Sequence, residues 1–159
     1  MKHRSVYRLK LAVCMLLTAT GGVKARESDV VALVLGGTSV IYSGIGWGDA
    51  NSKEVNTCGE GYDRNELNFP GVQAELLNLV SGQGKLVVLV MLNGCPYTIP
   101  EEMKKVDAVL EAWYPGEKGG DAISRILFGE VNPSGRLSVT FPPTTGRYRI
   151  TWHRKGRYW

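Results

Sequence analysis

The chain has 159 residues, of which 43% are hydrophobic and 21% are charged, and its formal net charge is +4. These values fit one globular domain with a real core and exclude a disordered or fibrous protein. The positive charge gathers in the two tails, between Lys2 and Lys10 and between Arg147 and Arg157, and the charges in between nearly balance. Because no basic stripe interleaved with aromatic residues runs along one face, we expect no nucleic-acid partner.

The N-terminal segment has the order of a secretory signal peptide. A basic start precedes an apolar run over residues 9–17, and small residues lead to Ala25. We therefore expect residues 1–25 to be a signal peptide or a non-native N-terminal segment, and the protein to be secreted or periplasmic. The apolar run is too short for a stable membrane span. Alternatively, residues 24–29 form the stub of a helix that leads into the first strand of a larger protein.

Four apolar runs of strand length follow, and turn residues end each of them. They cover residues 30–35, 86–92, 108–113 and 137–141. Continuous apolar runs of this length are typical of strands that are buried on both faces of a parallel sheet. Three helices are predicted between them, one from Pro70 to Gly82, one over residues 101–105 and one from Gly120 to Gly129. The alternation predicts an α/β fold, a layered sandwich with a mainly parallel sheet flanked by helices.

A long connection, residues 36–68, leaves the carboxyl end of the first predicted strand. Ligands bind beyond this end of parallel strands, and a connection of this length is typical of a binding or lid loop. It presents Glu60 between two glycines, which permit a tight turn and a close approach to a ligand. The glycines at 44, 46 and 48 lie too far past the strand for a dinucleotide fingerprint. The alternative to a site is a surface turn with solvated Asp63 and Arg64.

The number and positions of the histidines and cysteines limit which catalytic and metal sites are possible. The two histidines, His3 and His153, lie in the tails, so a Ser-His-Asp or Cys-His catalytic unit is excluded from the globular part. Cys58 and Cys95 are too few and too far apart for a metal-ligand spacing, and we expect neither a metal nor a cofactor. A disulfide between them is possible, but nothing in the sequence supports it.

Five motifs in order resemble the C-terminal α/β-sandwich domain of glycoside hydrolase family 3, the β-glucosidases and β-xylosidases. They are SDVV at 28–31, GEGYDR at 59–64 followed by Leu67 and residues 70–73, NGCP at 93–96, AWYPGEKGG at 112–120 and LFGEVNPSGRL at 127–137. Together they place this domain at residues 26–146.

The resemblance implies a retaining glycosidase that acts on a β-linked oligosaccharide or glycoside. Retaining hydrolysis needs two carboxyl groups about 5 Å apart. Glu60 occupies the position of the family's general acid/base, whereas Asp63 and Arg64 are expected to stabilise the loop, and Trp47 is the candidate for a sugar contact. For Trp113 and Tyr114 we expect core packing or docking of another domain rather than sugar stacking.

The chain also departs from the family pattern. The family's nucleophile belongs to a preceding (β/α)₈ barrel, and residues 1–25 are too short to form one. Residues 147–159 form a basic tail that we expect to be irregular, and a truncated or frame-shifted gene fragment is a further hypothesis. We expect the chain alone to be inactive. A (β/α)₈ barrel domain in trans is a candidate partner, and the sequence leaves open whether a partner chain supplies it. The alternative function is a non-catalytic carbohydrate-binding or domain-docking module, and the sequence leaves the sugar open.

Overall fold

The computed structural model describes residues 11–15, 26–38, 57–58, 64 and 66–144. These residues form four strands, Leu11–Met15 (β1), Val30–Gly36 (β2), Leu86–Leu92 (β3) and Ala108–Glu111 (β4), and three helices, Gln73–Ser81 (α3), Pro100–Met103 (α4) and Gly119–Leu127 (α5). The strands make one sheet in the order β1-β2-β3-β4, and every pairing is parallel. The expected α/β fold with a parallel sheet and flanking helices is confirmed.

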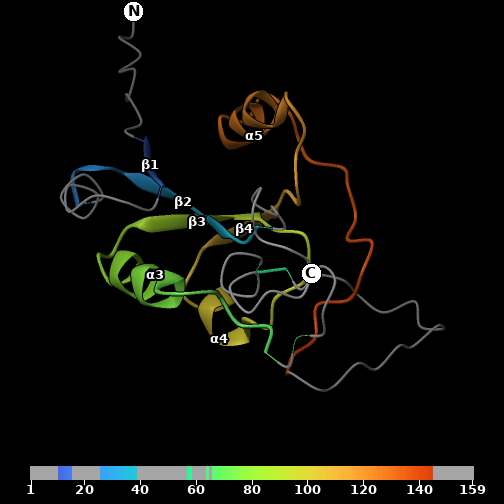
Figure 1. Ribbon diagram of the computed structural model, residues 1–159. Helices are drawn as coiled ribbons and strands as arrows, with labels where there is room; N and C mark the ends of the chain where they lie inside the picture. The colour runs from blue at the N-terminus through green and yellow to red at the C-terminus, as the bar shows by residue number, and fades with distance from the viewer. Residues whose placement is uncertain (1–10, 16–25, 39–56, 59–63, 65, 145–159) are drawn as a thin grey trace, which may run out of the picture.

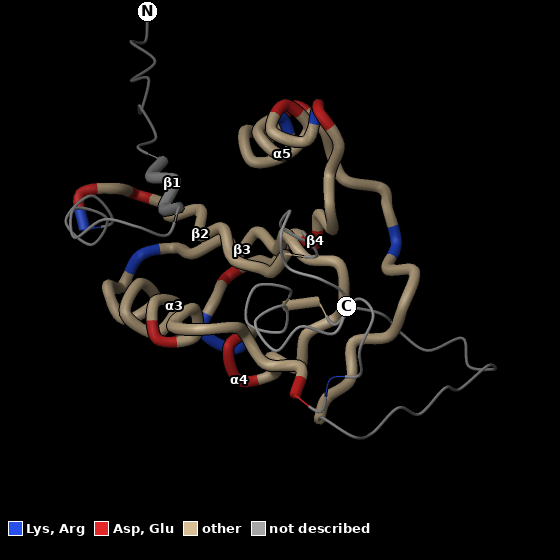
Figure 2. The backbone as a smooth tube through the Cα atoms, in the orientation of Figure 1, with Lys and Arg blue, Asp and Glu red and all other residues tan. Residues whose placement is uncertain are grey.

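The strand register brings the carboxyl ends of the strands to one edge of the sheet. Gly36 of β2 pairs with Leu92 of β3, and Met91 pairs with Glu111 of β4. β2 and β3 contain no charged residue, as their tan colour in Figure 2 shows, which fits strands in the interior of the sheet. Chemistry-bearing side chains therefore gather after the strands rather than within them.

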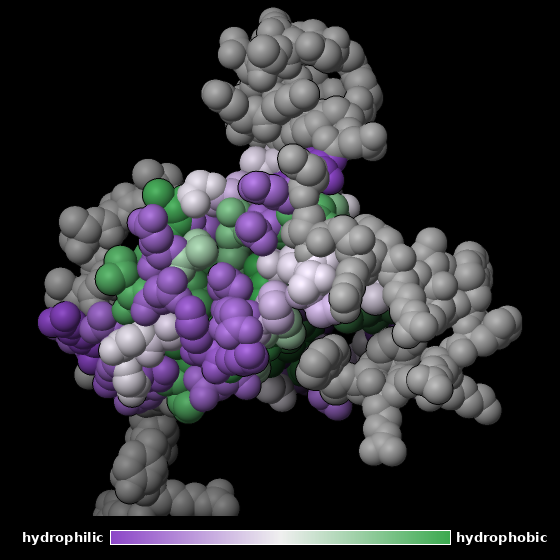
Figure 3. Space-filling model, turned by 90° about the horizontal axis from the view of Figure 1, so that it is seen from below, coloured by the Kyte–Doolittle hydropathy of each residue, from purple (hydrophilic) through white to green (hydrophobic). Residues whose placement is uncertain are grey.

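The helices form unequal layers on the two faces of the sheet. In Figure 1, α3 and α4 lie on one face and α5 lies on the other. The core fills the α3 face, where Leu77 and Val80 of α3 pack over alternate residues of β2 and β3; these strand residues are Val31, Leu33, Leu35, Val87, Leu89 and Met91. The surface over this layer is mostly hydrophilic, with scattered apolar side chains (Figure 3). Burial of each large apolar side chain stabilises the fold by about 1.5–3 kcal/mol.

A side chain joins the first residue of α3 to the end of β2. The Gln73 amide accepts a hydrogen bond from the Gly36 N–H at 2.8 Å and donates one to the Gly36 carbonyl at 2.7 Å. Gly36 also lies so close to β3 that a Cβ there would overlap the Leu92 carbonyl oxygen. This close approach requires glycine, and it fixes where the long connection begins.

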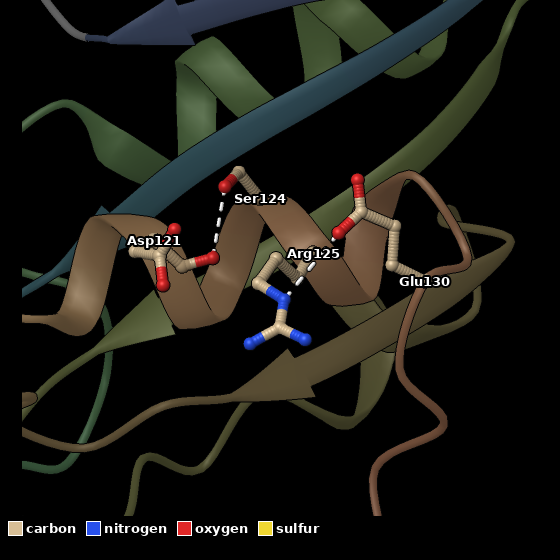
Figure 4. Close-up of polar contacts among 4 residues, drawn as sticks. All are labelled: Asp121, Ser124, Arg125 and Glu130. Atoms are coloured by element: carbon tan, nitrogen blue, oxygen red, sulfur yellow. Dashed lines mark hydrogen bonds and ion pairs between the residues drawn. The ribbon is translucent and has the colours of Figure 1, made fainter.

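α5 has well-formed local contacts. The Ser124 hydroxyl donates to the Asp121 carbonyl at 2.9 Å, and Arg125 pairs with Glu130 at 3.4 Å (Figure 4). At its end, Gly129 has φ +75°, and the N–H of Glu130 donates to the Arg125 carbonyl at 2.8 Å. This is the Schellman arrangement, which satisfies the last carbonyls of a helix. α5 is thus complete as a helix although little protein covers it.

Two predicted strands differ from the structure. Residues 137–141 are not a strand, because this segment lies exposed after α5, with Leu137 45% and Val139 46% accessible, and pairs with no described strand. The run expected over 108–113 stops at Glu111, since Trp113 has φ +53°, which a strand cannot accommodate. α3 begins at Gln73, three residues after Pro70.

The sequence does not predict β1, because the apolar run over residues 9–17 after a basic start is typical of a signal peptide. In the structure, β1 pairs with β2 from Leu11–Val30 to Met15–Val34. Removal of residues 1–25 would therefore leave β2 at the edge of the described sheet. Cleavage after Ala25 stays a prediction.

Candidate active site

The candidate site lies at the carboxyl edge of the sheet. Of its four predicted residues the structure places Arg64; Trp47, Glu60 and Asp63 lie outside the described residues. Thr57 and Cys58, which precede Glu60 in the chain, are described, so the base of the loop that carries Glu60 can be located.

Two threonines close the base of the long connection. The Thr57 N–H donates to the Thr38 carbonyl at 2.9 Å, and the Thr38 N–H donates to the Thr57 hydroxyl oxygen at 2.9 Å. Gly37, next to Thr38, donates its N–H to the Leu92 carbonyl at 3.0 Å. The chain therefore returns to the end of β2 and β3 three residues before Glu60.

Arg64 follows Glu60 in the chain and is anchored at the same edge of the sheet; we call residues 59–63, between Cys58 and Arg64, the Glu60 segment. Its Nη1 donates to the Thr57 carbonyl and lies 3.7 Å from the Sγ of Cys95, in the turn after β3. The guanidinium therefore spans from the loop base to the strand end. Asp63, its expected partner, lies outside the described residues, so the predicted contact between the two stays a prediction.

Tyr114 joins three segments at this edge. Its hydroxyl donates to the Gly37 carbonyl at 3.2 Å and shares a hydrogen bond with the Cys58 thiol at 2.6 Å. The Tyr114 ring packs so closely on Gly94 that a Cβ there would overlap it. For Tyr114 the sequence predicts core packing or domain docking, and no sequence pattern indicates these polar contacts. Trp113, its neighbour, is half-buried and packs its ring on Phe141, with centroids 5.9 Å apart.

Buried polar groups lie beneath this surface. Asn93 is fully buried, and its Nδ2 donates to the Cys95 carbonyl at 2.8 Å, which shapes the turn after β3. Tyr97 is 1% exposed and stacks against Phe69 with centroids 5.5 Å apart. Burial raises the pKa of the Tyr97 hydroxyl, which therefore stays protonated at neutral pH. The buried polar groups beneath this surface are thus neutral.

One carboxyl group of the described residues belongs to this edge. Glu111 ends β4, and its Oε1 accepts a hydrogen bond from the Trp113 N–H at 3.0 Å. Burial raises the pKa of Glu111 above its ordinary 4.5, and this effect exceeds the lowering by the Trp113 hydrogen bond. The sequence did not single out Glu111, because it sits in a predicted strand without a motif of its own.

In the part of the chain that the structure describes, no three His, Cys, Asp or Glu side chains gather as metal ligands. None of the described helices has the length and apolar character needed to cross a membrane.

The chain matches a known protein family. Residues 17–158 match the model of the glycosyl hydrolase family 3 C-terminal domain. The chain belongs to this family. The match extends at both ends beyond residues 26–146, the range expected from the motifs. The assignments of residues 1–25 and 147–159 stay predictions.

Relatives with curated names are whole glycosidases of which this chain matches a small part. A β-xylosidase of Formosa agariphila is 37% identical over 80% of this chain and 16% of its own length. A periplasmic β-glucosidase of Salmonella typhimurium is 35% identical over 79% of this chain and 14% of its length. Among solved structures, a β-glucosidase from Listeria innocua in complex with isofagomine has a TM-score of 0.64 at 34% identity, covering 80% of this chain and 16% of that one. The chain therefore spans about a sixth of these proteins.

Proposed function

We propose that this chain supplies the general acid/base half of a retaining β-glycosidase site, with Glu60 as the acid/base. The observation that carries the proposal is the position of the loop base at the carboxyl edge of the sheet. Thr57 and Arg64, which flank the Glu60 segment, are both anchored there. Parallel sheets bind their ligands at this edge.

In the proposed mechanism, Glu60 protonates the departing glycosidic oxygen and then removes a proton from the attacking water. The nucleophile, a second carboxylate about 5 Å away, comes from a (β/α)₈ barrel outside this chain. Arg64 stabilises the loop, and Trp47 contacts the sugar. The substrates of the relatives, named β-xylosidase and β-glucosidase, support a β-linked glycoside as substrate.

An extracytoplasmic location is part of the proposal. It is supported by the basic and apolar order of residues 1–25 and by the periplasmic β-glucosidase among the relatives.

The test is complementation. The purified chain is assayed on aryl β-glucosides and β-xylosides, alone and with an added barrel domain from a relative. We expect activity only in the mixture, and we expect Glu60→Gln to lower it by a factor of about 10² or more. Glu66→Gln is the matched control, because Glu66 is an exposed carboxyl nearby in the chain.

The outcomes separate the parts of the proposal. Activity of the mixture that survives Glu60→Gln would overturn the role of Glu60. Turnover by the chain alone, abolished by the same substitution, would show that no barrel is needed. No activity in any mixture would contradict half of a glycosidase site on this chain.

Exposed apolar side chains favour a second candidate, a domain-docking module. Phe128 is 63% exposed, and Val131, Leu137 and Val139 are at least 39% exposed. Exposed apolar surface of this kind is typical of contact sites. Binding of the barrel domain without any gain in hydrolysis, unchanged by Glu60→Gln, would favour docking over catalysis.

A further inference from the structure

Two cysteines from distant parts of the sequence meet at the base of the Glu60 segment. Cys58 and Cys95 are both present as thiols and are both half-buried. The N–H of Gly94, the residue immediately before Cys95, points at the Cys58 Sγ at 3.4 Å. The sulfur of Cys58 therefore lies against the peptide that leads into Cys95.

Two further side chains hold the thiols in this place. Arg64 contacts the Cys95 Sγ at 3.7 Å and also binds the carbonyl of Thr57, the residue before Cys58. The Tyr114 hydroxyl holds the Cys58 thiol at 2.6 Å. Burial, followed by the nearby Cys58 thiol, raises the pKa of Cys95 to about 11. Burial therefore makes Cys95 the poorer first nucleophile and suits it to a second, resolving step.

We propose that Cys58 and Cys95 form a reversible disulfide that fastens the Glu60 segment to the end of β3. The oxidant is a disulfide of the thiol pool, such as oxidised glutathione. The Cys58 thiolate attacks one sulfur of the oxidant, forms a mixed disulfide and releases one thiol. Cys95 then loses its proton to solvent and attacks the Cys58 sulfur, and the second thiol leaves. Two protein thiols are oxidised, and one disulfide of the oxidant is reduced to two thiols.

The proposed disulfide would tie the long connection to the turn after β3. Cys58 lies two residues before Glu60, and Cys95 lies in the turn after β3, which Asn93 shapes through the Cys95 carbonyl. The disulfide would replace weak thiol contacts with a covalent link at one side of the loop. The disulfide would form whether or not the chain takes part in hydrolysis.

The test uses the full native chain in glutathione buffers of graded potential, followed by alkylation, trypsin digestion and mass spectrometry. Trypsin leaves the three cysteines on separate peptides, residues 11–24, 54–64 and 86–104. We expect a linked pair of the second and third peptides that appears in oxidising buffers and disappears in reducing ones. Thermal unfolding of the oxidised chain is expected about 5 °C or more above that of the reduced chain.

Oxidation in denaturant is the matched control, because there the three possible pairings compete without the fold. Selective pairing of Cys58 with Cys95 in buffer but not in denaturant supports the inference. Cys58→Ser and Cys95→Ser should each abolish the linked peptides and the thermal difference between oxidised and reduced chain. Thiols that stay reduced across the whole series, pairing with the 11–24 peptide, or only intermolecular disulfides would overturn it.

Discussion

α3 and α5 are both nine-residue helices that flank the same sheet, yet they bury very different side chains. α3 places Leu77 and Val80 at 0% and 4% exposure over β2 and β3. In α5 the buried residue is Gly119, and Phe128 just beyond its end is 63% exposed. The apolar residues of α5 are at best half-buried, although their spacing is typical of a core-facing helix.

The difference distinguishes a helix whose apolar side chains are covered by the sheet from one whose apolar side chains stay partly exposed. The α3 side has a closed core, whereas the end of α5 and residues 131–139 carry exposed apolar side chains. α5 itself lies on the opposite face of the sheet (Figure 1). The chain matches about a sixth of the length of its relatives. We therefore expect the α5 side to be a contact surface for further protein, and the stability of the isolated chain to depend on the α3 side.

The largest expected effect tests this asymmetry directly. Leu89→Ala removes a fully buried side chain from the α3 side, and we expect the free energy of unfolding to fall by about 2–5 kcal/mol. The matched change in the segment after α5, Leu137→Ala, affects a residue that is 45% exposed and should cost about 0.5 kcal/mol or less. Urea unfolding of both variants measures the two values. Equal losses would contradict a one-sided core.

Alanine substitutions at two glycines, Gly36 and Gly120, should change the stability of the chain in opposite directions. Gly36→Ala would push a Cβ into the Leu92 carbonyl between β2 and β3, and it should destabilise the chain by about 1–3 kcal/mol. Gly120→Ala, inside α5, meets no atom within 4 Å and should stabilise the helix by up to about 1 kcal/mol. Thermal unfolding gives both signs. A stabilising Gly36→Ala would show that the two strands can move apart at little cost.

The two interior strands could be predicted from their apolar sequence pattern. The same pattern explains why residues 137–141 were wrongly predicted as a strand and why β1 was missed. Residues 30–35 and 86–92 are apolar without interruption, and both proved to be strands with neighbours on each side. Residues 137–141 are nearly as apolar, but a strand also needs a partner, and an apolar pattern does not show whether one exists. β1 was missed because a short apolar run after basic residues has the same composition as a signal peptide.

The sequence motif predicts site residues but not their contacts. GEGYDR predicts Glu60 and Arg64, of which the structure describes Arg64. The contact of Arg64 with Cys95 spans 31 residues and joins the long connection to the turn after β3. The hydrogen bond from Tyr114 to the Gly37 carbonyl spans 77 residues, because β2 and β4 are both neighbours of β3. Contacts at the carboxyl edge depend on which strands are neighbours. A local sequence pattern does not show the order of the strands in the sheet.

The smallest expected effect concerns Glu111, at the end of β4. Because burial raises its pKa above the ordinary 4.5, the folded chain binds this proton more tightly than the unfolded chain does. The contribution to stability is complete below pH 4.5 and is lost as the pH rises through the folded-state pKa. Glu111→Gln keeps an oxygen for the Trp113 N–H and has no charge to bury, so it should raise Tm at pH 7 by about 2 °C or less.

The advantage of Glu111→Gln should shrink as the pH falls towards 4, where the native carboxyl is also neutral. Glu117→Gln, at an exposed position before α5, is the matched control. Scanning calorimetry of the three proteins between pH 4 and pH 8 measures the difference. A Glu111→Gln variant that is less stable at pH 7 would mean that the carboxylate gains more from the Trp113 N–H than it loses by burial. The carboxyl edge would then be organised around a charge at Glu111.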